Sequence, residues 1–256
     1  MIPLNLFNFL PISRNRARSV YRFLSRKILR NINIGHYEPS IIYSKEDANY
    51  SLDLIDLMVD SLKIAARTNL TSGKIDLPDS QFLNVFPGEH YRLLNAIVKA
   101  SNSKKVVEIG TATGLSALAM QESISDISVI TYDIIEWDKF QTHFDKVDFE
   151  GSRIRQIIGD LSDDNFFNYN YDILNDADII FMDAPKDDFF EYKMAHKLST
   201  LTKKPFRLLI IDDIQFVNMI DFWRSITSPK IDMTSFGHWS GTGVVDISEG
   251  LKLKKA

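Results

Sequence analysis

The chain has 256 residues, 45% of them hydrophobic and 25% charged, which suffices for one sizeable hydrophobic core. It contains no cysteine, so disulfides and thiolate metal sites are excluded, and any bound metal must use oxygen or imidazole ligands. The longest early apolar stretch, IPLNLFNFLPI, is too short to span a bilayer and lacks the features of a secretory signal, so we expect a cytoplasmic protein.

Charge is distributed unevenly along the chain. Seven basic and no acidic residues precede Glu38, so the remainder carries a net charge of −11 against −4 for the whole chain. Residues 13–30 have helical periodicity, with one apolar stripe and arginines four residues apart. Such a helix could lie on an anionic membrane, dock an acidic partner, or pack on its own domain or a second subunit. Nucleic acid fits less well, because the arm has no recognisable binding module and the body is acidic.

A second helix is predicted over residues 46–66, with a row of apolar residues on one face. The stretch TNLTSGKIDLPDS then reads as a loop, because Gly73 and Pro78 mark turns. We therefore divide the chain into an N-terminal basic arm with a helical extension, residues 1–80, and a main domain, residues 81–256.

Beyond Gly88, short apolar strands alternate with amphipathic helices. Strands are predicted over residues 104–110, 128–133, 154–160, 177–184 and 207–213, and helices over 89–100, from about 116, and over 137–147, 188–201 and 217–226. This alternation is typical of an α/β fold, a doubly wound and mostly parallel sheet. The last strands, KIDMTSF and TGVVDIS, are separated only by GHWSG, so we expect an antiparallel pair at the sheet edge.

Ligands of such sheets bind outside the carboxyl ends of the strands. The first strand leads into VVEIGTATGLS, where Gly110 and Gly114 allow a tight turn and close backbone approach. This is not a dinucleotide fingerprint, because Ala112 replaces the middle glycine and no basic residue follows to hold phosphate. Asp133, at the end of the second strand, would suit ribose hydroxyls, and Asp160, after the third, could accept from an adenine amino group.

A nucleoside without phosphates fits these strand ends better than NAD or ATP. Each of these motifs alone is weak evidence for a ligand, and a glycine turn between strand and helix is often structural. Their combination favours S-adenosylmethionine (SAM). The predicted cofactor-binding residues are Glu108, Gly110, Thr111, Gly114, Ser116, Asp133, Asp160 and Asp183.

Three stretches resemble the cation-dependent O-methyltransferases of the caffeoyl-CoA and catechol type. FPGEHYRLLNAIVKASNSKKVVEIGTATGLSALAM resembles the entry to the SAM site of that family, and IIFMDAPKDDFFEY is similar to its Asp-x-x-Lys segment. LLIIDDI falls where the family has an Asp–Asn pair, and the second acid resembles the macrolide-sugar O-methyltransferases, a related cation-dependent branch. The resemblance, which spans roughly residues 87–214, implies the fold described above, a SAM cofactor and a homodimer.

The resemblance also implies a divalent cation held by Asp183, Asp212 and Asp213. Hard cations such as Mg²⁺, Mn²⁺ or Ca²⁺ take oxygen ligands, and carboxylates at neighbouring strand ends can share one ion. The cation would relieve the repulsion between adjacent acids. The alternative for Asp213 is that it caps the following helix.

By the same resemblance Lys186 is the catalytic base, its pKa lowered by the nearby dication. It could instead be a surface lysine that pairs with Asp187 or Asp188. His238 is a rival base or substrate contact, although a lone histidine in an edge hairpin is more often structural. Trp137 could stack on adenine, but packing is the commoner role of a large aromatic at a helix start.

These observations together predict a SAM-dependent O-methyltransferase acting on a small hydroxylated acceptor, a sugar or a catechol-like phenol. The family's glycine pair before the fifth strand and its tryptophan-bearing loop are here TKKPFR and QFVNM, and both changes touch the acceptor side. Two alternatives stay open: a metal-independent methyltransferase that uses Lys186 or His238 alone, and a SAM-binding docking module that uses the basic arm.

Overall fold

The computed structural model describes residues 44–139 and 141–254. The basic helix predicted over residues 13–30 lies outside the described residues. Within the described ranges no helix combines the length and apolarity required to cross a membrane.

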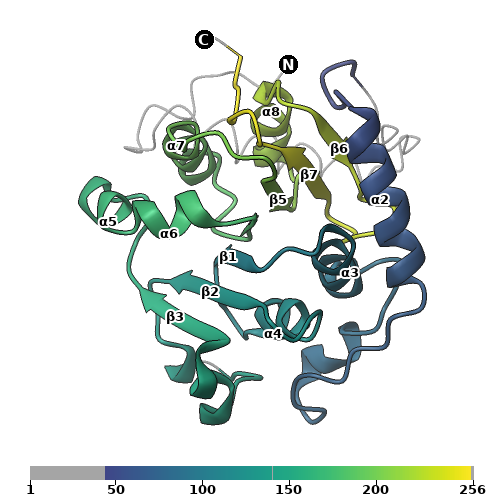
Figure 1. Ribbon diagram of the computed structural model, residues 1–256, viewed down its shortest axis with the longest axis vertical. Coiled ribbons are helices and arrows are strands. Elements are labelled where there is room, and N and C mark those ends of the chain that lie inside the picture. The colour runs from purple at the N-terminus through teal and green to yellow at the C-terminus, as the bar shows by residue number, and fades with distance from the viewer. Residues whose placement is uncertain (1–43, 140, 255–256) are drawn as a thin grey trace, which may run out of the picture. The chain divides into compact units, whose positions relative to one another are not determined.

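A seven-stranded sheet in the order β3-β2-β1-β4-β5-β7-β6 forms the centre of the fold (Figure 1). Strands β1 to β5 are parallel, and β7 runs antiparallel to both β5 and β6. The predicted mostly parallel sheet and its antiparallel edge pair are therefore confirmed. The strands are β1 (Lys105–Ile109), β2 (Ser128–Asp133), β3 (Ile154–Ile158), β4 (Ile179–Met182), β5 (Leu208–Asp212), β6 (Lys230–Asp232) and β7 (Thr242–Asp246).

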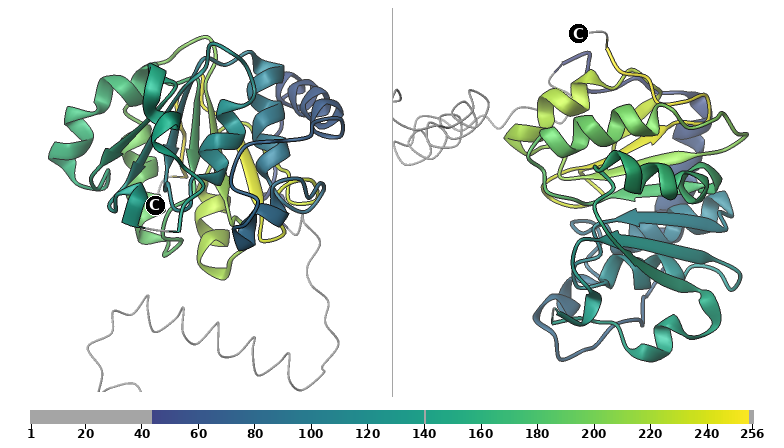
Figure 2. Two further views of the ribbon diagram at one scale, coloured as in Figure 1. Left: turned by 90° about the horizontal axis from the view of Figure 1, so that it is seen from below. Right: turned by 90° about the vertical axis from the view of Figure 1, so that its left-hand side faces the viewer.

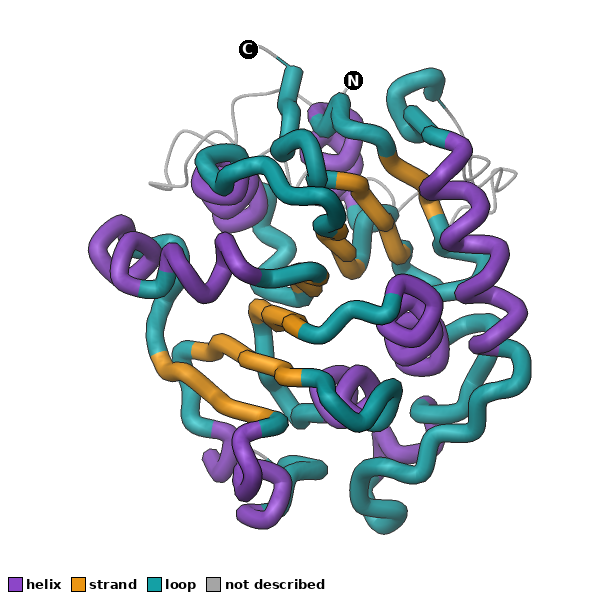
Figure 3. The backbone as a smooth tube through the Cα atoms, viewed as in Figure 1, coloured by secondary structure: helices purple, strands orange, loops and turns teal. Residues whose placement is uncertain are grey.

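Helices cover both faces of the sheet, as the two views in Figure 2 and the tube in Figure 3 show. One face packs on α2 (Leu52–Ala65), α3 (Tyr91–Ser101) and α4 (Leu115–Gln121), and the other on α5 (Asp164–Tyr169), α6 (Tyr171–Asp176), α7 (Phe189–Leu198) and α8 (Val217–Ser225). Successive strand residues point to opposite faces, so Val106 packs in the core under α2, α3 and α4, and Val107 packs in the core under α5 to α8. This explains why the strands read as continuous apolar runs.

Helix α2 begins later than the predicted residue 46. The Ser51 hydroxyl accepts from the Leu54 N–H at 3.2 Å, which caps the helix. Upstream, the Asp47 carboxylate pairs with Arg224 of α8 at 2.6 Å. Leu54 and Met58 of α2 belong to the same core as α3 and the sheet, whereas the predicted division at residue 80 stays a prediction.

The helix predicted over residues 137–147 is wrong. Two short 3₁₀ helices, η3 (Trp137–Lys139) and η4 (Lys146–Ser152), occur in this region instead. The His143 N–H donates to the Thr113 carbonyl at 2.9 Å, and its ring contacts Asp79 at 2.8 Å. These contacts fasten the segment to the turn after β1, so it cannot follow a helical path.

The sequence analysis also missed α5 and α6, which connect β3 to β4. Each has six residues, too few for a periodic apolar pattern. The Asp163 carboxylate caps α5 by accepting from the Phe166 N–H at 2.9 Å. Asn170 separates the two helices, and its buried side chain accepts from the Tyr132 hydroxyl at 3.1 Å.

The strand order reverses between β1 and β4, which is where ligands bind in doubly wound sheets. Gly110 leaves β1 with φ +104°, and a Cβ there would lie 1.9 Å from the carbonyl oxygen of Asp183. The turn after β1 therefore passes directly against the end of β4. Only glycine permits this combination of backbone angle and close approach.

Candidate active site

Three carboxylates meet at the ends of β4 and β5. Asp183 follows β4, Asp212 ends β5, and Asp213 comes next. One oxygen from each lies within 4.8 Å of the other two, although Asp212 and Asp213 are only 2% and 5% exposed. The acids predicted to share a cation are thus adjacent in space.

Lys186 projects its ammonium group into this cluster. Its Nζ lies 3.0 Å from Asp213 Oδ2 and also pairs with Asp183. Its backbone has φ +56°, an uncommon angle for a residue with a side chain, and its N–H donates to Glu191 Oε1 at 2.8 Å. Asp187 instead accepts from the N–H groups at the start of α7. Lys186 is therefore part of the acidic cluster.

Asp213 does not cap α8, because the residue at the N-cap position is Phe216 and no side chain caps that helix end. Its carboxylate accepts from the Ser240 hydroxyl and contacts Lys186. The backbone of Asp213 has φ +61°, and its N–H donates to the Gly241 carbonyl at 2.7 Å. The capping alternative is therefore wrong.

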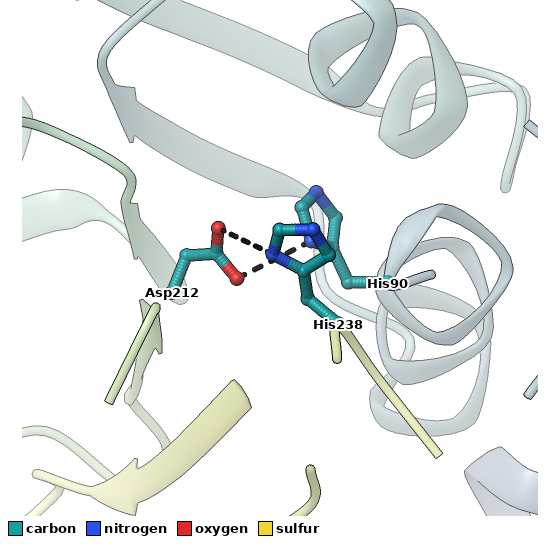
Figure 4. A group of neighbouring side chains, drawn as sticks. All are labelled: His90, Asp212 and His238. Atoms are coloured by element: carbon teal, nitrogen blue, oxygen red, sulfur yellow. Dashed lines mark ion pairs between the residues drawn. The ribbon is translucent and has the colours of Figure 1, made fainter. Parts of the chain in front are cut away.

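Two histidines complete the cluster (Figure 4). His90 directly precedes α3, and His238 lies in the loop between β6 and β7. Each Nδ1 is 3.3 Å from a different oxygen of Asp212, and that of His238 is also 3.4 Å from Asp213 Oδ1. The sequence analysis missed His90 and favoured a structural role for His238. The available signal was the buried acidic pair, which requires cationic neighbours.

The charges in the cluster shift one another's pKa. Burial opposes ionisation of Asp212, but the two imidazoles outweigh burial and hold its pKa well below the usual range. Burial also opposes a charge on His238, yet Asp212 and Asp213 raise its pKa to about 10. The pKa of Lys186 is likewise raised by Asp183 and Asp213 against the effect of burial. Lysine and histidine thus compensate the three acids.

The carboxylate cluster fits a hard divalent cation. Among the described residues, Asp212 Oδ1 is buried without a hydrogen-bond donor. Burial and the negative charge of Asp212 raise the pKa of Asp183, and the charges of Lys186 and His90 only partly oppose this. Closely spaced carboxylate oxygens, one of them buried without a hydrogen bond, are the donor set that Mg²⁺, Mn²⁺ and Ca²⁺ use.

The predicted cofactor residues gather around the turn after β1, except Asp160. Asp133 Oδ2 accepts from the N–H groups of Thr111 and Ala112 at 2.9 and 3.1 Å. Ser116 donates to buried Glu108 Oε1 at 2.5 Å. Asp160 instead lies in an exposed turn, where it accepts from Ser162.

Gly114 begins α4 with φ +83°, and a Cβ there would lie 2.3 Å from the Phe144 ring. Gly110 and Gly114 are thus both required by the protein's own packing.

A cavity of about 660 Å³ lies beside β2 and β3, a volume within the range of small-molecule sites. Trp137 and Gln156 line it, and Gln156 Nε2 donates to the Thr111 hydroxyl at 3.1 Å, which joins the cavity wall to the glycine turn. Trp137 also stacks on Phe149, with ring centroids 5.1 Å apart. None of the clustered acids lines this cavity.

A sequence model of a family described as O-methyltransferase matches residues 63–220. Among solved structures, the SAH-bound methyltransferase PaMTH1 of Podospora anserina is 15% identical, over 98% of this chain and 100% of that chain, with a TM-score of 0.43. An O-methyltransferase from Bacillus cereus in complex with SAH is 14% identical, over 90% and 97% of the two chains, with a TM-score of 0.42.

The methyltransferase MycE of the mycinamycin biosynthetic pathway, in complex with Mg and SAH, is 15% identical, over 73% of this chain and 54% of that chain, with a TM-score of 0.42. At these identities and TM-scores, the solved structures add nothing about function to the family match. No curated protein is similar enough to match the chain.

Proposed function

The chain belongs to the O-methyltransferase family, and we propose that it methylates a hydroxyl of a small acceptor, with SAM as donor and a divalent cation beside the acceptor. The family match confirms the predicted O-methyltransferase. The observation that carries the finer proposal is the cluster of Asp183, Asp212 and Asp213 around Lys186, beside the point where the strand order reverses.

SAM would bind at the carboxyl ends of β1 and β2. The glycine turn there presents backbone groups. Asp133 Oδ2 already accepts from Thr111 and Ala112, so the carboxylate would accept from a ribose hydroxyl at Oδ1, which accepts from the Ile135 N–H and keeps a free lone pair. The cavity beside Trp137 has room for the adenine. This arrangement would aim the methyl group toward the end of β4.

The acceptor would bind where Asp183, Asp212 and Asp213 converge. A dication held by these carboxylates would lower the pKa of a hydroxyl bound to it and fix that hydroxyl in place. Trp239 is 70% exposed, and its ring centroid lies 5.5 Å from that of His238. An aromatic face beside the cluster suits a sugar or a catechol-like phenol.

Lys186 would accept the hydroxyl proton at Nζ while the acceptor oxygen bonds to the methyl carbon and the sulfur leaves with the bonding electrons. This requires a neutral amine, whereas Asp183 and Asp213 keep Lys186 charged. These carboxylates would hold the ammonium proton less strongly once they share their charge with a cation. Alignment of donor and acceptor would supply much of the remaining acceleration.

The test is SAH formation by metal-stripped protein supplied with SAM, Mg²⁺ or Mn²⁺, and a panel of sugars and phenols. Lys186→Met should lower kcat by about 10²- to 10⁴-fold, the usual contribution of a positioned base, while the calorimetric affinity for SAM stays unchanged. Lys203→Met is the matched control, because its side chain is 69% exposed and pairs with Glu249. Full activity of Lys186→Met would contradict the assigned base.

A metal-independent methyltransferase is the second candidate. This candidate is favoured because Lys186, His90 and His238 already compensate the charge of the acids through side-chain ion pairs. In that case Lys186 or His238 would act as the base alone. The same assay separates the candidates, since chelation should abolish activity only if a cation takes part.

A further inference from the structure

His90, Asp212 and His238 form a second group of ligating side chains, distinct from the carboxylate cluster except for Asp212 (Figure 4). One ligand atom from each lies within 4.8 Å of the others. The three come from distant parts of the sequence and converge from the start of α3, the end of β5 and the loop before β7. The group offers two imidazoles and one carboxylate.

Two buried atoms in this group face each other as an ion pair but make no hydrogen bond. His90 and Asp212 are 4% and 2% exposed, and within the described part of the chain His90 Nδ1 and Asp212 Oδ1 make no hydrogen bond. Buried polar atoms are nearly always satisfied. The two atoms lie 3.3 Å from each other, too far for a good hydrogen bond and close enough to bind one ion together.

The spacing matches that of ligands around a small transition metal. Atoms at two corners of a tetrahedron, each about 2.0–2.1 Å from a Zn²⁺ ion, lie about 3.3 Å apart. Nδ1 of His90 and Nδ1 of His238 each lie 3.3 Å from an oxygen of Asp212.

The surroundings of His238 also resemble those of a metal-binding histidine. Its Nε2 lies 3.6 Å from Glu89 Oε2, and metal-ligating histidines commonly turn the second ring nitrogen toward a carboxylate. Its Nδ1 lies 2.7 Å from the Ser240 hydroxyl, which in turn donates to Asp213. These contacts hold the ring in place with its Nδ1 3.3 Å from Asp212 Oδ2, and a metal ion there would replace the proton that Nδ1 shares with Ser240.

We propose that His90, Asp212 and His238 bind a transition-metal ion such as Zn²⁺ or Co²⁺. Imidazole nitrogen suits these ions, whereas Mg²⁺ and Ca²⁺ prefer oxygen ligands throughout. The inference rests on the proposed function only through Asp212, which both groups share. Because two of its three ligands are imidazoles, this site would select a transition metal, whereas the carboxylate cluster would select Mg²⁺ or Ca²⁺.

The experiment titrates the metal-stripped full-length protein with Co²⁺ and follows visible absorption. We expect one equivalent to bind with the intense bands of nitrogen-ligated cobalt of low coordination number, and Zn²⁺ but not Mg²⁺ to displace it. His238→Gln should weaken Co²⁺ binding by at least about tenfold. His196→Gln, an exposed position on α7, should leave it unchanged.

Asp183→Asn distinguishes this proposal from the carboxylate site, because Asp183 belongs only to the latter. Co²⁺ affinity should survive this substitution. Unchanged affinity in His238→Gln, or the absence of one-to-one binding in the unsubstituted protein, would overturn the inference and leave the carboxylate site untouched. Because His90 is buried and its variants can fail to fold, the test relies on His238, whose side chain is 20% exposed, with thermal melting as the check of folding.

Discussion

Glu108 is fully buried at the end of β1, and burial raises the pKa of its carboxyl to about 8 from an ordinary 4.5. The folded protein therefore keeps this proton over a pH range in which the unfolded chain releases it. Because the unfolded state then binds fewer protons, the free energy of unfolding falls as the pH rises from about 4.5 to 8.

Glu108→Gln should remove this pH-dependent loss. As the pH rises from 5 to 8, the free energy of unfolding of the variant should increase relative to that of the wild type by on the order of 2–4 kcal/mol, measured by urea unfolding. Glu150→Gln, at an exposed position, is the control and should track the wild type. If the free energies of unfolding of Glu108→Gln and the wild type differed by the same amount at every pH, the buried carboxyl would be ionised in the folded protein.

Glu191 is 1% exposed and accepts from the backbone N–H of Lys186, which has a positive φ. This contact fixes the loop that aims Lys186 at the acids, so Glu191 is a positioning residue. Glu191→Ala should lower kcat by about 10- to 100-fold and leave SAM affinity intact, whereas Glu191→Gln keeps an acceptor oxygen and should restore most of the rate. Equal losses in both variants would mean that the negative charge matters instead.

Sequence reasoning found the acids and Lys186 because strand ends and a family motif mark them. It could not weigh the histidines correctly, since nothing in FPGEHYR or GHWSG shows that these loops converge on Asp212. Their importance arises from tertiary contacts with Asp212, which lies 122 positions after His90 and 26 positions before His238.

At the scale of elements, the turn from β1 to α4 is held against β4 by the lack of a side chain at Gly110. Gly110→Ala would press a methyl group onto the backbone of Asp183 and would also strain φ. We therefore expect the free energy of unfolding, measured with urea, to fall by at least about 3 kcal/mol. Gly151→Ala is the matched control: it has a similar positive φ and open space around it, and should cost about 1 kcal/mol. Equal costs would show that the close approach contributes nothing.

Strands and long helices could be predicted because both strand faces are buried and the helices are amphipathic. The segment after β2 could not, because its aromatic residues pack on one another while Asp79 and Thr113 hold His143. Apolar residues at helical spacing there serve a local cluster rather than a helix. The six-residue helices α5 and α6 were missed for the opposite reason, since they are too short to show a period.

For the whole molecule, the described residues belong to one compact unit, and the basic arm precedes them in the sequence. We predict that a chain of residues 44–256 keeps the melting temperature and SAM affinity of the full protein but loses binding to vesicles of anionic lipid, measured by co-sedimentation. Retained vesicle binding by the shorter chain would exclude the arm as the membrane contact. Light scattering on both chains tests whether the expected homodimer needs the arm.

The central claim is that the acids at the ends of β4 and β5 hold a divalent cation beside the SAM site. The most direct measurement is calorimetric titration of Mg²⁺ and Mn²⁺ into metal-stripped protein saturated with SAM. We predict one metal-binding event that Asp183→Asn abolishes while SAM affinity is retained. Metal binding that persists in Asp183→Asn, or its absence from the unsubstituted protein, would contradict the account.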